Sequence, residues 1–417
     1  MTGTGFNGFW LNDALVRGID AAGFETPRPI QAESIPAGLQ GRDVLGLAQT
    51  GTGKTAAFAL PLLDRIMQNP GRYPRALVLA PTRELATQIE AEIRTLARFT
   101  RLQTVTIFGG VPPIKQLRAL NRNPEIVVGC PGRVLDLLEQ GALPLDRIET
   151  LVLDEADHMF DMGFLPDVRK ILGFLPHDRQ NLLFSATMPK EIRRLADELL
   201  TSPHVVELAG KAPAATIDHA LVLVSEQRKR DLLEHVLTGD DCDSAIVFTR
   251  TKHRARRLAD QLCRSGHKAV GIQGNLSQNA RDRAMRGFRS RQFDILVATD
   301  IVARGIDVSG VSHVINFDVP NTPEAYTHRI GRTGRSERDG VACTFVTGGD
   351  HGWLRATERM IGSSIERLQV DGFAADPERK SSSGPGPRGQ GGRRGPSRAP
   401  QGGRRHGPGP NRRRRTR

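Results

Sequence analysis

The stretch Ala48–Thr55, which reads Ala-Gln-Thr-Gly-Thr-Gly-Lys-Thr, constrains the fold of this chain more than any other feature. It follows the apolar run Val44–Leu47, which predicts a buried strand, and it precedes the run Ala56–Leu60, which predicts a helix start. A strand, a glycine turn, Lys-Thr and a helix form the context of a phosphate-binding loop. Backbone N–H groups and the helix N-terminus bind phosphate oxygens in such a loop, so the pattern predicts a nucleotide-binding α/β domain.

Two side chains of this stretch have the chemistry that the loop requires. Lys54 can reach the β- and γ-phosphates, and the Thr55 hydroxyl can ligate Mg²⁺. The strict pattern has glycine at its first position, where this chain has Ala48. A glycine-rich turn without a ligand is the alternative interpretation, and a second motif argues against it.

The second motif is Asp154-Glu155-Ala156-Asp157, which follows the apolar run Thr150–Leu153. A carboxylate at the end of a buried strand, downstream of a phosphate loop, is where a nucleotide-hydrolysing enzyme holds Mg²⁺. Glu155 could orient or deprotonate the attacking water. A solvated acidic turn is the alternative, but Lys54 needs a partner of this kind in the same domain.

Length and composition indicate a soluble chain with more than one domain. The 417 residues exceed one ordinary core, and 38% of them are hydrophobic while 25% are charged. No apolar run approaches membrane-spanning length, so we expect a cytoplasmic protein without a membrane partner. The cysteines are scattered and form no C-x-x-C pair, which favours reduced thiols over zinc ligands or disulfides. They are Cys130, Cys242, Cys263 and Cys343.

The positive charge is concentrated at the C-terminus. The formal net charge is +13, and residues Ser381–Arg417 contain eleven arginines and no acidic residue, which leaves about +2 for the rest. This Gly-, Pro-, Ser- and Arg-rich segment cannot bury enough apolar surface to fold. Arginine without acid is typical of nucleic-acid binding, and a merely solubilising tail is the alternative.

Apolar runs of strand length alternate with helical segments along the chain, which predicts parallel sheets covered on both faces. In such sheets ligands bind at the carboxyl ends of the strands, where the polar turns of this chain occur. In the first half the predicted strands are Val44–Leu47, Ala76–Ala80, Val105–Phe108, Ile126–Val128, Leu151–Leu153 and Leu182–Phe184. In the second half they are Leu221–Val224, Ala245–Phe248, Ala269–Ile272, Ile295–Ala298, Val314–Phe317 and Cys343–Val346.

The second half has no phosphate loop of its own and contributes arginines instead. The turn at 328–335 contains Arg332 and Arg335, either of which could act as an arginine finger. Between the halves, around His204–Thr216, the strand and helix pattern weakens, which predicts a linker.

The motifs, in this order over roughly residues 6–370, resemble those of DEAD-box ATP-dependent RNA helicases, and the tail is similar to that of bacterial RhlE-type members. The resemblance implies an α/β protein with two tandem RecA-like P-loop NTPase-type domains and a disordered basic tail. The implied divisions are an adenine-recognition segment at 1–40, an ATP-binding domain at 41–207, a linker at 208–215, a helicase C-terminal domain at 216–371 and the tail at 372–417.

The resemblance also assigns the ATP site. Gln31 would read the adenine base, Asp154 would hold Mg²⁺ with Thr55, largely through water, and Glu155 would be the catalytic base. Arg332 and Arg335 would reach the γ-phosphate, and Asp307 the ribose. The other implied ATP-binding residues are Phe6, Phe24, Ala48, Gln49, Thr50, Gly51, Thr52, Gly53 and Lys54.

Two further sets follow from the resemblance. The residues implied to couple hydrolysis to strand separation are Ser185, Ala186, Thr187, Asp157, His328 and Arg329. The residues implied to contact the RNA backbone are Pro81, Thr82, Arg83, Gly110, Gly132, Arg133, Arg250, Gly274, Gln278, Arg281, Thr299 and Arg304.

The chain departs from the family pattern at three positions. Cys130 stands where threonine is usual, Gln273 where histidine is usual, and Arg28 where a small hydroxyl residue is usual. The first two departures affect expected RNA contacts, and none of the three removes a residue of the phosphate chemistry.

The expected ligands are ATP, Mg²⁺ and RNA bound without sequence preference, with the basic tail assisting and the protein a monomer. The alternatives are a DNA translocase of the same superfamily and an RNA clamp without turnover. The complete set Lys54, Asp154, Glu155, Arg332 and Arg335 argues against the clamp. Ribosome assembly, RNA decay and cold adaptation are all open as pathways.

Overall fold

A computed structural model describes residues 5–49, 51–69, 71–208, 217–239, 241–300, 311–333, 340–370 and 373. All of these fall in one compact unit. The expected linker at 208–215 and tail at 372–417 lie outside the described residues, except for Leu208 and Phe373.

The first domain is built on a sheet whose seven described strands are ordered β3-β4-β2-β5-β6-β1-β7 and pair in parallel. Every residue of β2, β4 and β5 is buried, which explains why these strands read as continuous apolar runs. The strands are β1 (Val44–Leu47), β2 (Ala76–Leu79), β3 (Thr104–Ile107), β4 (Ile126–Gly129), β5 (Thr150–Leu153), β6 (Gln180–Ser185) and β7 (His204–Glu207).

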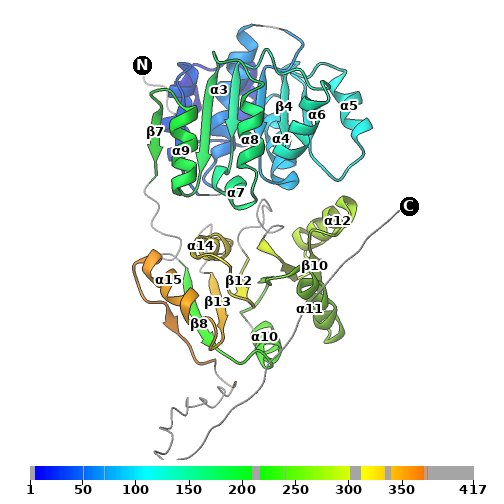
Figure 1. The fold of residues 1–417 in the computed structure, drawn as a ribbon, viewed down its shortest axis with the longest axis vertical. Coiled ribbons are helices and arrows are strands. Elements are labelled where there is room, and N and C mark those ends of the chain that lie inside the picture. The colour runs from blue at the N-terminus through cyan, green and yellow to red at the C-terminus, as the bar shows by residue number, and fades with distance from the viewer. Residues whose placement is uncertain are drawn as a thin grey trace, which may run out of the picture. The chain divides into compact units, whose positions relative to one another are not determined.

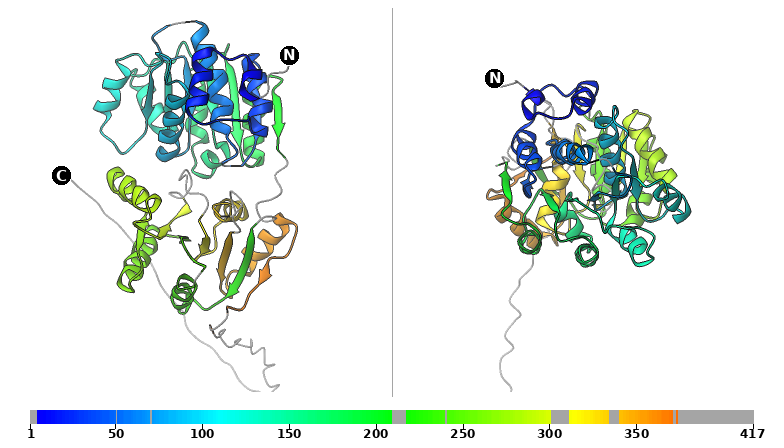
Figure 2. Two further views of the ribbon diagram at one scale, coloured as in Figure 1. Left: turned by 180° about the vertical axis from the view of Figure 1, so that it is seen from behind. Right: turned by 90° about the horizontal axis from the view of Figure 1, so that it is seen from above.

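Helices cover both faces of this sheet (Figures 1 and 2). One face is covered by the 3-10 helix η1 (Gly5–Phe9) and by α1 (Asp13–Ala21), α2 (Pro29–Leu39), α3 (Lys54–Gln68) and α4 (Arg83–Leu96). The other face is covered by α5 (Pro113–Leu120), α6 (Pro131–Glu139), α7 (Ala156–Asp161), α8 (Leu165–Leu172) and α9 (Lys190–Leu199). The predicted layers are therefore confirmed.

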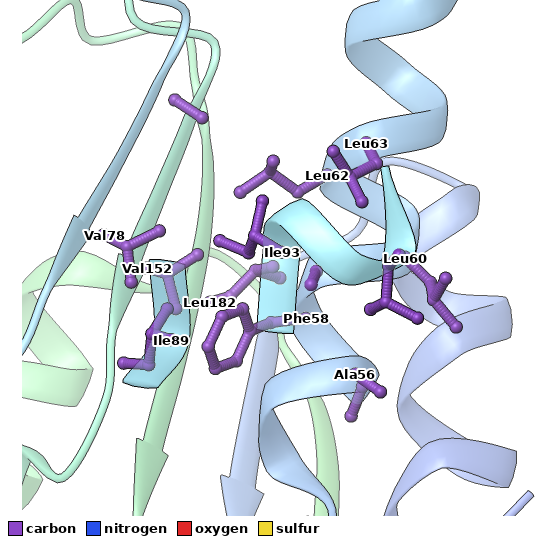
Figure 3. Close-up of a cluster of buried hydrophobic side chains, with 14 of the residues drawn as sticks. Ala56, Phe58, Leu60, Leu62, Leu63, Val78, Ile89, Ile93, Val152 and Leu182 are labelled. Carbon is purple, nitrogen blue, oxygen red and sulfur yellow. The ribbon is translucent and has the colours of Figure 1, made fainter. Parts of the chain in front are cut away.

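The core beneath α3 fixes the helix that follows the phosphate loop (Figure 3). Phe58 on α3 is fully buried and packs against Phe184 of β6, with ring centroids 5.5 Å apart. Val78, Val152 and Leu182 of the central strands face the same cluster, and each is at most 1% exposed. Burying side chains of this size stabilises the fold by roughly 1.5–3 kcal/mol each, so the loop begins from a rigid base.

The second domain repeats the arrangement, with strand order β10-β11-β9-β12-β13-β8-β14 and parallel pairing. The strands are β8 (Asp218–Leu223), β9 (Ala245–Phe248), β10 (Ala269–Ile272), β11 (Ile295–Ala298), β12 (His313–Asn316), β13 (Val341–Val346) and β14 (Glu366–Arg367). One face is covered by α10 (Lys229–Leu237) and α11 (Lys252–Arg264), and the other by α12 (Gln278–Arg289), α14 (Pro323–Ile330) and α15 (His351–Ile361).

The interpretation of residues 204–207 as part of a linker is wrong, because they form β7. This strand pairs with β1 in parallel, with Val44 opposite His204. β7 is the last strand in the order of the sheet, so it has one neighbouring strand. Because only Val206 of β7 is buried, the strand lacks a continuous apolar run. The two-residue strand β14 was also missed, for the same reason.

Two expectations from composition can be compared with the structure. The four cysteines are free, with Cys130 and Cys343 buried. Within the described ranges, no helix combines the length and apolarity needed to cross a bilayer.

Candidate active site and RNA-binding residues

The phosphate loop joins β1 to α3 through two glycines with positive φ. Gly51 has φ +84° and Gly53 has φ +92°, a region that favours glycine over residues with a Cβ atom. Lys54, the first residue of α3, is 6% exposed and donates from Nζ to the Ala48 carbonyl at 3.0 Å. The lysine therefore lies folded under the loop. Thr55 and Thr52 are half-buried beside it, and Thr50 is outside the described residues.

Gln31 and Arg28 connect helix α2 to this loop. The Gln31 amide donates to the Gly53 carbonyl at 3.1 Å, and the Arg28 guanidinium donates to the Gly51 carbonyl at 2.6 Å. The Arg28 backbone N–H donates in turn to the Gln31 side-chain oxygen at 2.9 Å. The adenine-recognition segment and the phosphate loop are thus directly bonded, and Arg28 contributes one of these bonds.

Asp154 follows β5 and lies beside Lys54. Its carboxylate is 4.0 Å from the Lys54 Nζ and accepts the Glu155 backbone N–H at 3.0 Å. Burial raises the pKa of Asp154 to about 7, and the positive charge of Lys54 offsets this only in part. The carboxyl group is therefore in a place that favours a cation close by.

Glu155 is held in an unusual backbone conformation with φ 54° and ψ 53°, which is left-handed and costs energy for a residue with a Cβ atom. Its carboxylate lies 2.8 Å from the His158 Nδ1, and both side chains are buried. Burial alone would raise the pKa of Glu155, but the charge and hydrogen bond of His158, together with Lys54 and Arg332, lower it. Glu155 is therefore ionised and fixed in orientation.

Asp157 connects the acidic motif to the end of β6. It accepts both the backbone N–H and the hydroxyl of Thr187 at 2.9 Å, while its own N–H donates to the Ser185 hydroxyl at 3.2 Å. The Ser185 hydroxyl donates to the Thr187 carbonyl at 2.8 Å, and Ala186 lies between the two in the chain. These predicted coupling residues therefore form one hydrogen-bonded network.

Two residues of the second domain's predicted set have defined partners. The His328 Nδ1 lies 3.0 Å from the His158 Nε2, and its Nε2 lies 3.9 Å from the Asp157 carboxylate. The Arg329 guanidinium donates hydrogen bonds to both oxygens of the Asp300 carboxylate, at 2.5 and 2.8 Å, and to the Asn316 side-chain oxygen at 3.1 Å. Arg329 thus holds the end of β11 to β12.

The remaining predicted ATP contacts differ in what the structure shows. Phe6 is 4% exposed and packs edge-on against Phe24, with ring centroids 5.8 Å apart. Arg332 is buried, and its charge acts on Glu155. Asp307 and Arg335 lie outside the described residues.

The predicted RNA contacts of the first domain lie at the carboxyl ends of β2, β3 and β4. Thr82 caps α4 by accepting the Leu85 N–H at 3.2 Å, and Pro81 beside it is buried. The Arg83 guanidinium lies against Gly110, whose φ of +75° favours glycine over residues with a Cβ atom. Gly132 and Arg133 are half-buried in the first turn of α6.

In the second domain the predicted contacts lie after β9, β10 and β11. The Arg250 side chain is 52% exposed and Gly274 faces open space, whereas Thr299 is buried. Arg281 is 8% exposed and pairs with Glu84 at 2.9 Å. Arg304 and the side chain of Gln278 are outside the described residues.

The residues that depart from the family pattern also have defined surroundings. Cys130 is buried at the start of α6, and burial raises the pKa of its thiol to about 12, so it does not act as a thiolate. The Gln273 side chain accepts the Asn275 N–H at 3.1 Å and shapes the turn after β10.

Sequence reasoning missed His158, whose ring contacts both Glu155 and His328. A signal existed, because residues three apart on a helix share a face, and His158 is three residues after Glu155. It also missed Asp300, because only the fold brings its carboxylate to Arg329.

Two tandem RecA-like sheets, one with a phosphate loop and a buried lysine–carboxylate pair, define a nucleotide-dependent enzyme of the helicase type. The DEAD/DEAH box helicase model matches residues 28–195, and the helicase conserved C-terminal domain model matches residues 228–337. The ATP-dependent RNA helicase CshA of Listeria monocytogenes is 45% identical over 368 residues, which cover 88% of this chain and 71% of the relative. CshA of Bacillus subtilis is 45% identical over 365 residues, covering 87% and 74%.

Solved structures agree. Dbp5 of S. cerevisiae bound to RNA and ADP BeF3 matches with a TM-score of 0.78 and 34% identity, covering 88% of this chain and 96% of that one. Mss116p bound to single-stranded RNA and AMP-PNP matches with a TM-score of 0.79 and 27% identity, covering 89% and 80%. The chain belongs to the DEAD-box ATP-dependent RNA helicase family, whose members are RNA-stimulated ATPases. The RhlE-type subgroup stays a prediction.

Proposed function

We propose that this helicase hydrolyses Mg²⁺-bound ATP at the carboxyl edge of the first sheet and uses the reaction for local RNA strand separation or remodelling of RNA–protein complexes. The observation that supports this most directly is the position of the Glu155 carboxylate, which is held 2.8 Å from the His158 ring next to the Lys54–Asp154 pair. A carboxylate held in this way can orient water and accept its proton.

The residues at this site suit a magnesium ion that is coordinated jointly by the protein and the phosphates of the nucleotide. Asp154 is buried with an elevated pKa, so a nearby divalent cation would favour its ionised form. Among the described residues no group of three or more metal-ligating side chains could enclose a metal alone. Mg²⁺ keeps several waters and is held by one or two protein groups plus phosphates, so Thr55 and Asp154 would suffice. The ion would neutralise charge on the phosphates.

The remaining ATP contacts follow from the same edge. Lys54 would exchange the Ala48 carbonyl for a phosphate oxygen, and loop N–H groups would bind the phosphates. Gln31 would present one donor and one acceptor to the adenine edge, while its contact to Gly53 ties the base site to the loop. Arg332 would stabilise the charge that develops on the γ-phosphate.

RNA would lie across the carboxyl ends of both sheets and be read through its backbone, without sequence preference. The basic segment 381–417 would hold RNA near the domains. We further propose a cytoplasmic monomer that can serve ribosomal or RNA-decay assemblies.

The test compares ATP hydrolysis with single-stranded RNA and with single-stranded DNA of the same sequence, each with Mg²⁺ and with a chelator. Stimulation by RNA that requires Mg²⁺ is expected. Equal stimulation by DNA would favour the DNA translocase, and RNA binding without turnover would favour the clamp.

A further inference from the structure

The second domain carries an open groove between α10 and α11, away from the residues assigned above to ATP. Its volume is about 790 Å³, and its lining includes Gln227, Arg230, Thr251, Arg254, Arg257 and Phe317. The floor is a fixed polar layer. The Arg254 guanidinium stacks on the Phe317 ring, 4.8 Å from its centroid, and bonds to the Asp318 carboxylate at 3.0 Å.

The first domain has a helix where this groove is open. Helix α1 packs across α3 and α4, which correspond to α10 and α11. Gly18 of α1 lies so close to the Leu96 carbonyl of α4 that no Cβ atom fits. The Asn12 N–H donates to Asp64 of α3 at 2.9 Å, and Leu15 of α1 is fully buried. Among the described residues, the corresponding space over α10 and α11 is the groove.

The groove differs from its counterpart in chemistry, which limits what can occupy it. The first domain uses apolar side chains under α1, whereas arginines line the groove. Helix α11 contains five Lys or Arg residues and one acidic residue, Asp260. Arg256 and Arg257 are exposed and form no ion pair among the described residues. An apolar helix would leave these charges unpaired, so the surface suits an anion.

The acidic residues of the groove do not cancel this charge. Glu226 already pairs with the Lys229 ammonium at 3.1 Å and with Arg254. Asp231 is the other carboxylate of the lining, and Arg230 pairs with Glu234 on the same helix at 3.4 Å. The lining has three arginines against two carboxylates, so it keeps an excess of positive charge that favours an anion over a cation.

Two features place RNA at this groove rather than another polyanion. Thr251 lines the groove and directly follows Arg250, a predicted contact of the catalytic RNA path, so RNA bound at Arg250 would lie close to the groove. Phe373 stacks under the Arg228 guanidinium at 4.2 Å and lies against His235, both beside α10. Phe373 therefore lies close to α10, and the arginine-rich sequence 381–417 follows it in the chain.

We infer that the α10–α11 groove is an accessory RNA-binding site that takes the phosphodiester backbone of single-stranded RNA leaving the catalytic path. Guanidinium groups bind phosphates bidentately. Arg230 and Arg257 line the groove, and Arg230 would exchange its pair with Glu234 for a phosphate. The site adds affinity without touching ATP, so it changes the RNA concentration that the enzyme needs and not its turnover.

The test is the full-length double variant Arg230→Glu/Arg257→Glu, assayed for ATP hydrolysis against increasing concentrations of a uridine homopolymer long enough to extend beyond the catalytic path. The RNA concentration for half-maximal hydrolysis should rise about tenfold at low salt, and turnover at saturating RNA should be unchanged. The log–log salt dependence of RNA binding should become shallower by about 1.4, because each phosphate bound on a single strand contributes about 0.7 to the slope.

A matched control is Arg355→Glu/Arg359→Glu on α15, which makes the same charge change on exposed residues of the same domain. Its helix packs on the opposite face of the sheet from α10 and α11. The neutral pair Arg230→Gln/Arg257→Gln should give a smaller shift, and equal melting temperatures would show that folding is intact. A groove variant that behaves like the α15 control would overturn the inference and leave the groove to an acidic protein segment. Loss of saturated turnover would also overturn it.

Discussion

The two RecA-like domains place a lysine beside an aspartate at equivalent positions. Lys54 begins α3 after β1, and Asp154 follows β5. Lys229 begins α10 after β8, and Asp318 comes after β12, whose position in the second sheet matches that of β5 in the first. The ammonium–carboxylate distances are 4.0 Å in the first domain and 3.5 Å in the second.

The surroundings of the two pairs differ in charge balance. In the second domain, Glu226 and Arg254 complete a set of two cations and two carboxylates, and apolar Val319 stands where Glu155 stands in the first domain. In the first domain, three buried carboxylates lie near Lys54, which bonds to a backbone carbonyl, while His158 and Arg332 act on Glu155. In the second domain Glu226 thus gives Lys229 the negative partner that an ATP phosphate would give Lys54 in the first domain.

The parallel sheet therefore fixes where such a pair lies, while the adjoining loop decides what it does. Self-neutralised charges stabilise a domain, whereas unbalanced charges favour a ligand at some expense of stability. Substitutions in the two domains can test this division, and they are ordered here by decreasing expected effect.

Replacing Glu155 by glutamine should have the largest effect on hydrolysis, because the proton acceptor is removed while the phosphate-binding groups remain. The RNA-stimulated rate should fall by about 10²- to 10⁴-fold with ATP and RNA still bound. Rate measurements together with binding of a fluorescent ATP analogue test this. A large loss of ATP affinity would contradict it.

Replacing Lys54 and replacing Lys229 should have different effects on ATP binding and on stability. Lys54→Ala should slow hydrolysis by about 10²- to 10³-fold and also weaken ATP binding, because the ammonium group no longer binds the transferring phosphoryl group. Lys229→Ala should leave ATP affinity unchanged but lower the melting temperature, because Asp318 is 3% exposed and loses a partner. Equal effects of the two variants on ATP affinity would break the comparison.

Gln31→Ala should narrow the preference for ATP over GTP. Guanine has an acceptor where adenine has a donor, so GTP loses one hydrogen bond to the Gln31 carboxamide. The loss leaves a polar group unpaired and weakens binding by roughly 1–3 kcal/mol. The second domain has no described counterpart of this residue over its loop. Hydrolysis of both nucleotides by the variant measures the effect, and an unchanged ratio counts against the assignment.

The stability of the first site should depend on pH in a defined direction. Burial raises the pKa of Asp154 from 3.8 to about 7, so the folded state binds this proton more tightly than the unfolded state. The stability from that proton is lost as the pH rises through 7. Asp154→Asn should therefore raise the melting temperature by about 3 °C or more at pH 8 and by less at pH 5.

The matched variant Asp318→Asn should instead lower the melting temperature at pH 8, since Lys229 and Arg254 lose their shared carboxylate. Thermal melts at both pH values measure the pair. Stabilisation by both substitutions, or by neither, would show that the two sites do not differ in charge balance.

Removing residues 381–417 should have the smallest effect. The RNA concentration for half-maximal hydrolysis should rise a few-fold with saturated turnover nearly unchanged, because the arginines hold RNA but take no part in hydrolysis. The salt dependence of binding should weaken by about 0.7 for each phosphate that the segment binds in the full-length protein. Identical salt slopes would mean that the segment does not bind RNA.

The strands and the phosphate loop could be predicted from local patterns in the sequence. Buried parallel strands are continuous apolar runs, and twelve such runs were predicted in place, from Val44–Leu47 to Cys343–Val346. The loop was readable because its glycines and Lys-Thr are required by backbone geometry and phosphate binding, which are local constraints. The edge strand β7 was not readable, because an edge strand has one partner and a mostly exposed pattern.

Which side chains contact one another depends on the tertiary fold. The bonds of Glu155 to His158, of Arg329 to Asp300 and of Arg28 to Gly51 depend on how helices and strands pack. The same is true of the balanced charges around Lys229, which a sequence shows only as a scattered set of ionisable residues. The pairs of Arg329 with Asp300, of Arg28 with Gly51 and of Lys229 with Asp318 join residues tens of positions apart, so no local pattern encodes them. The free energy of burying charge is set by the three-dimensional surroundings.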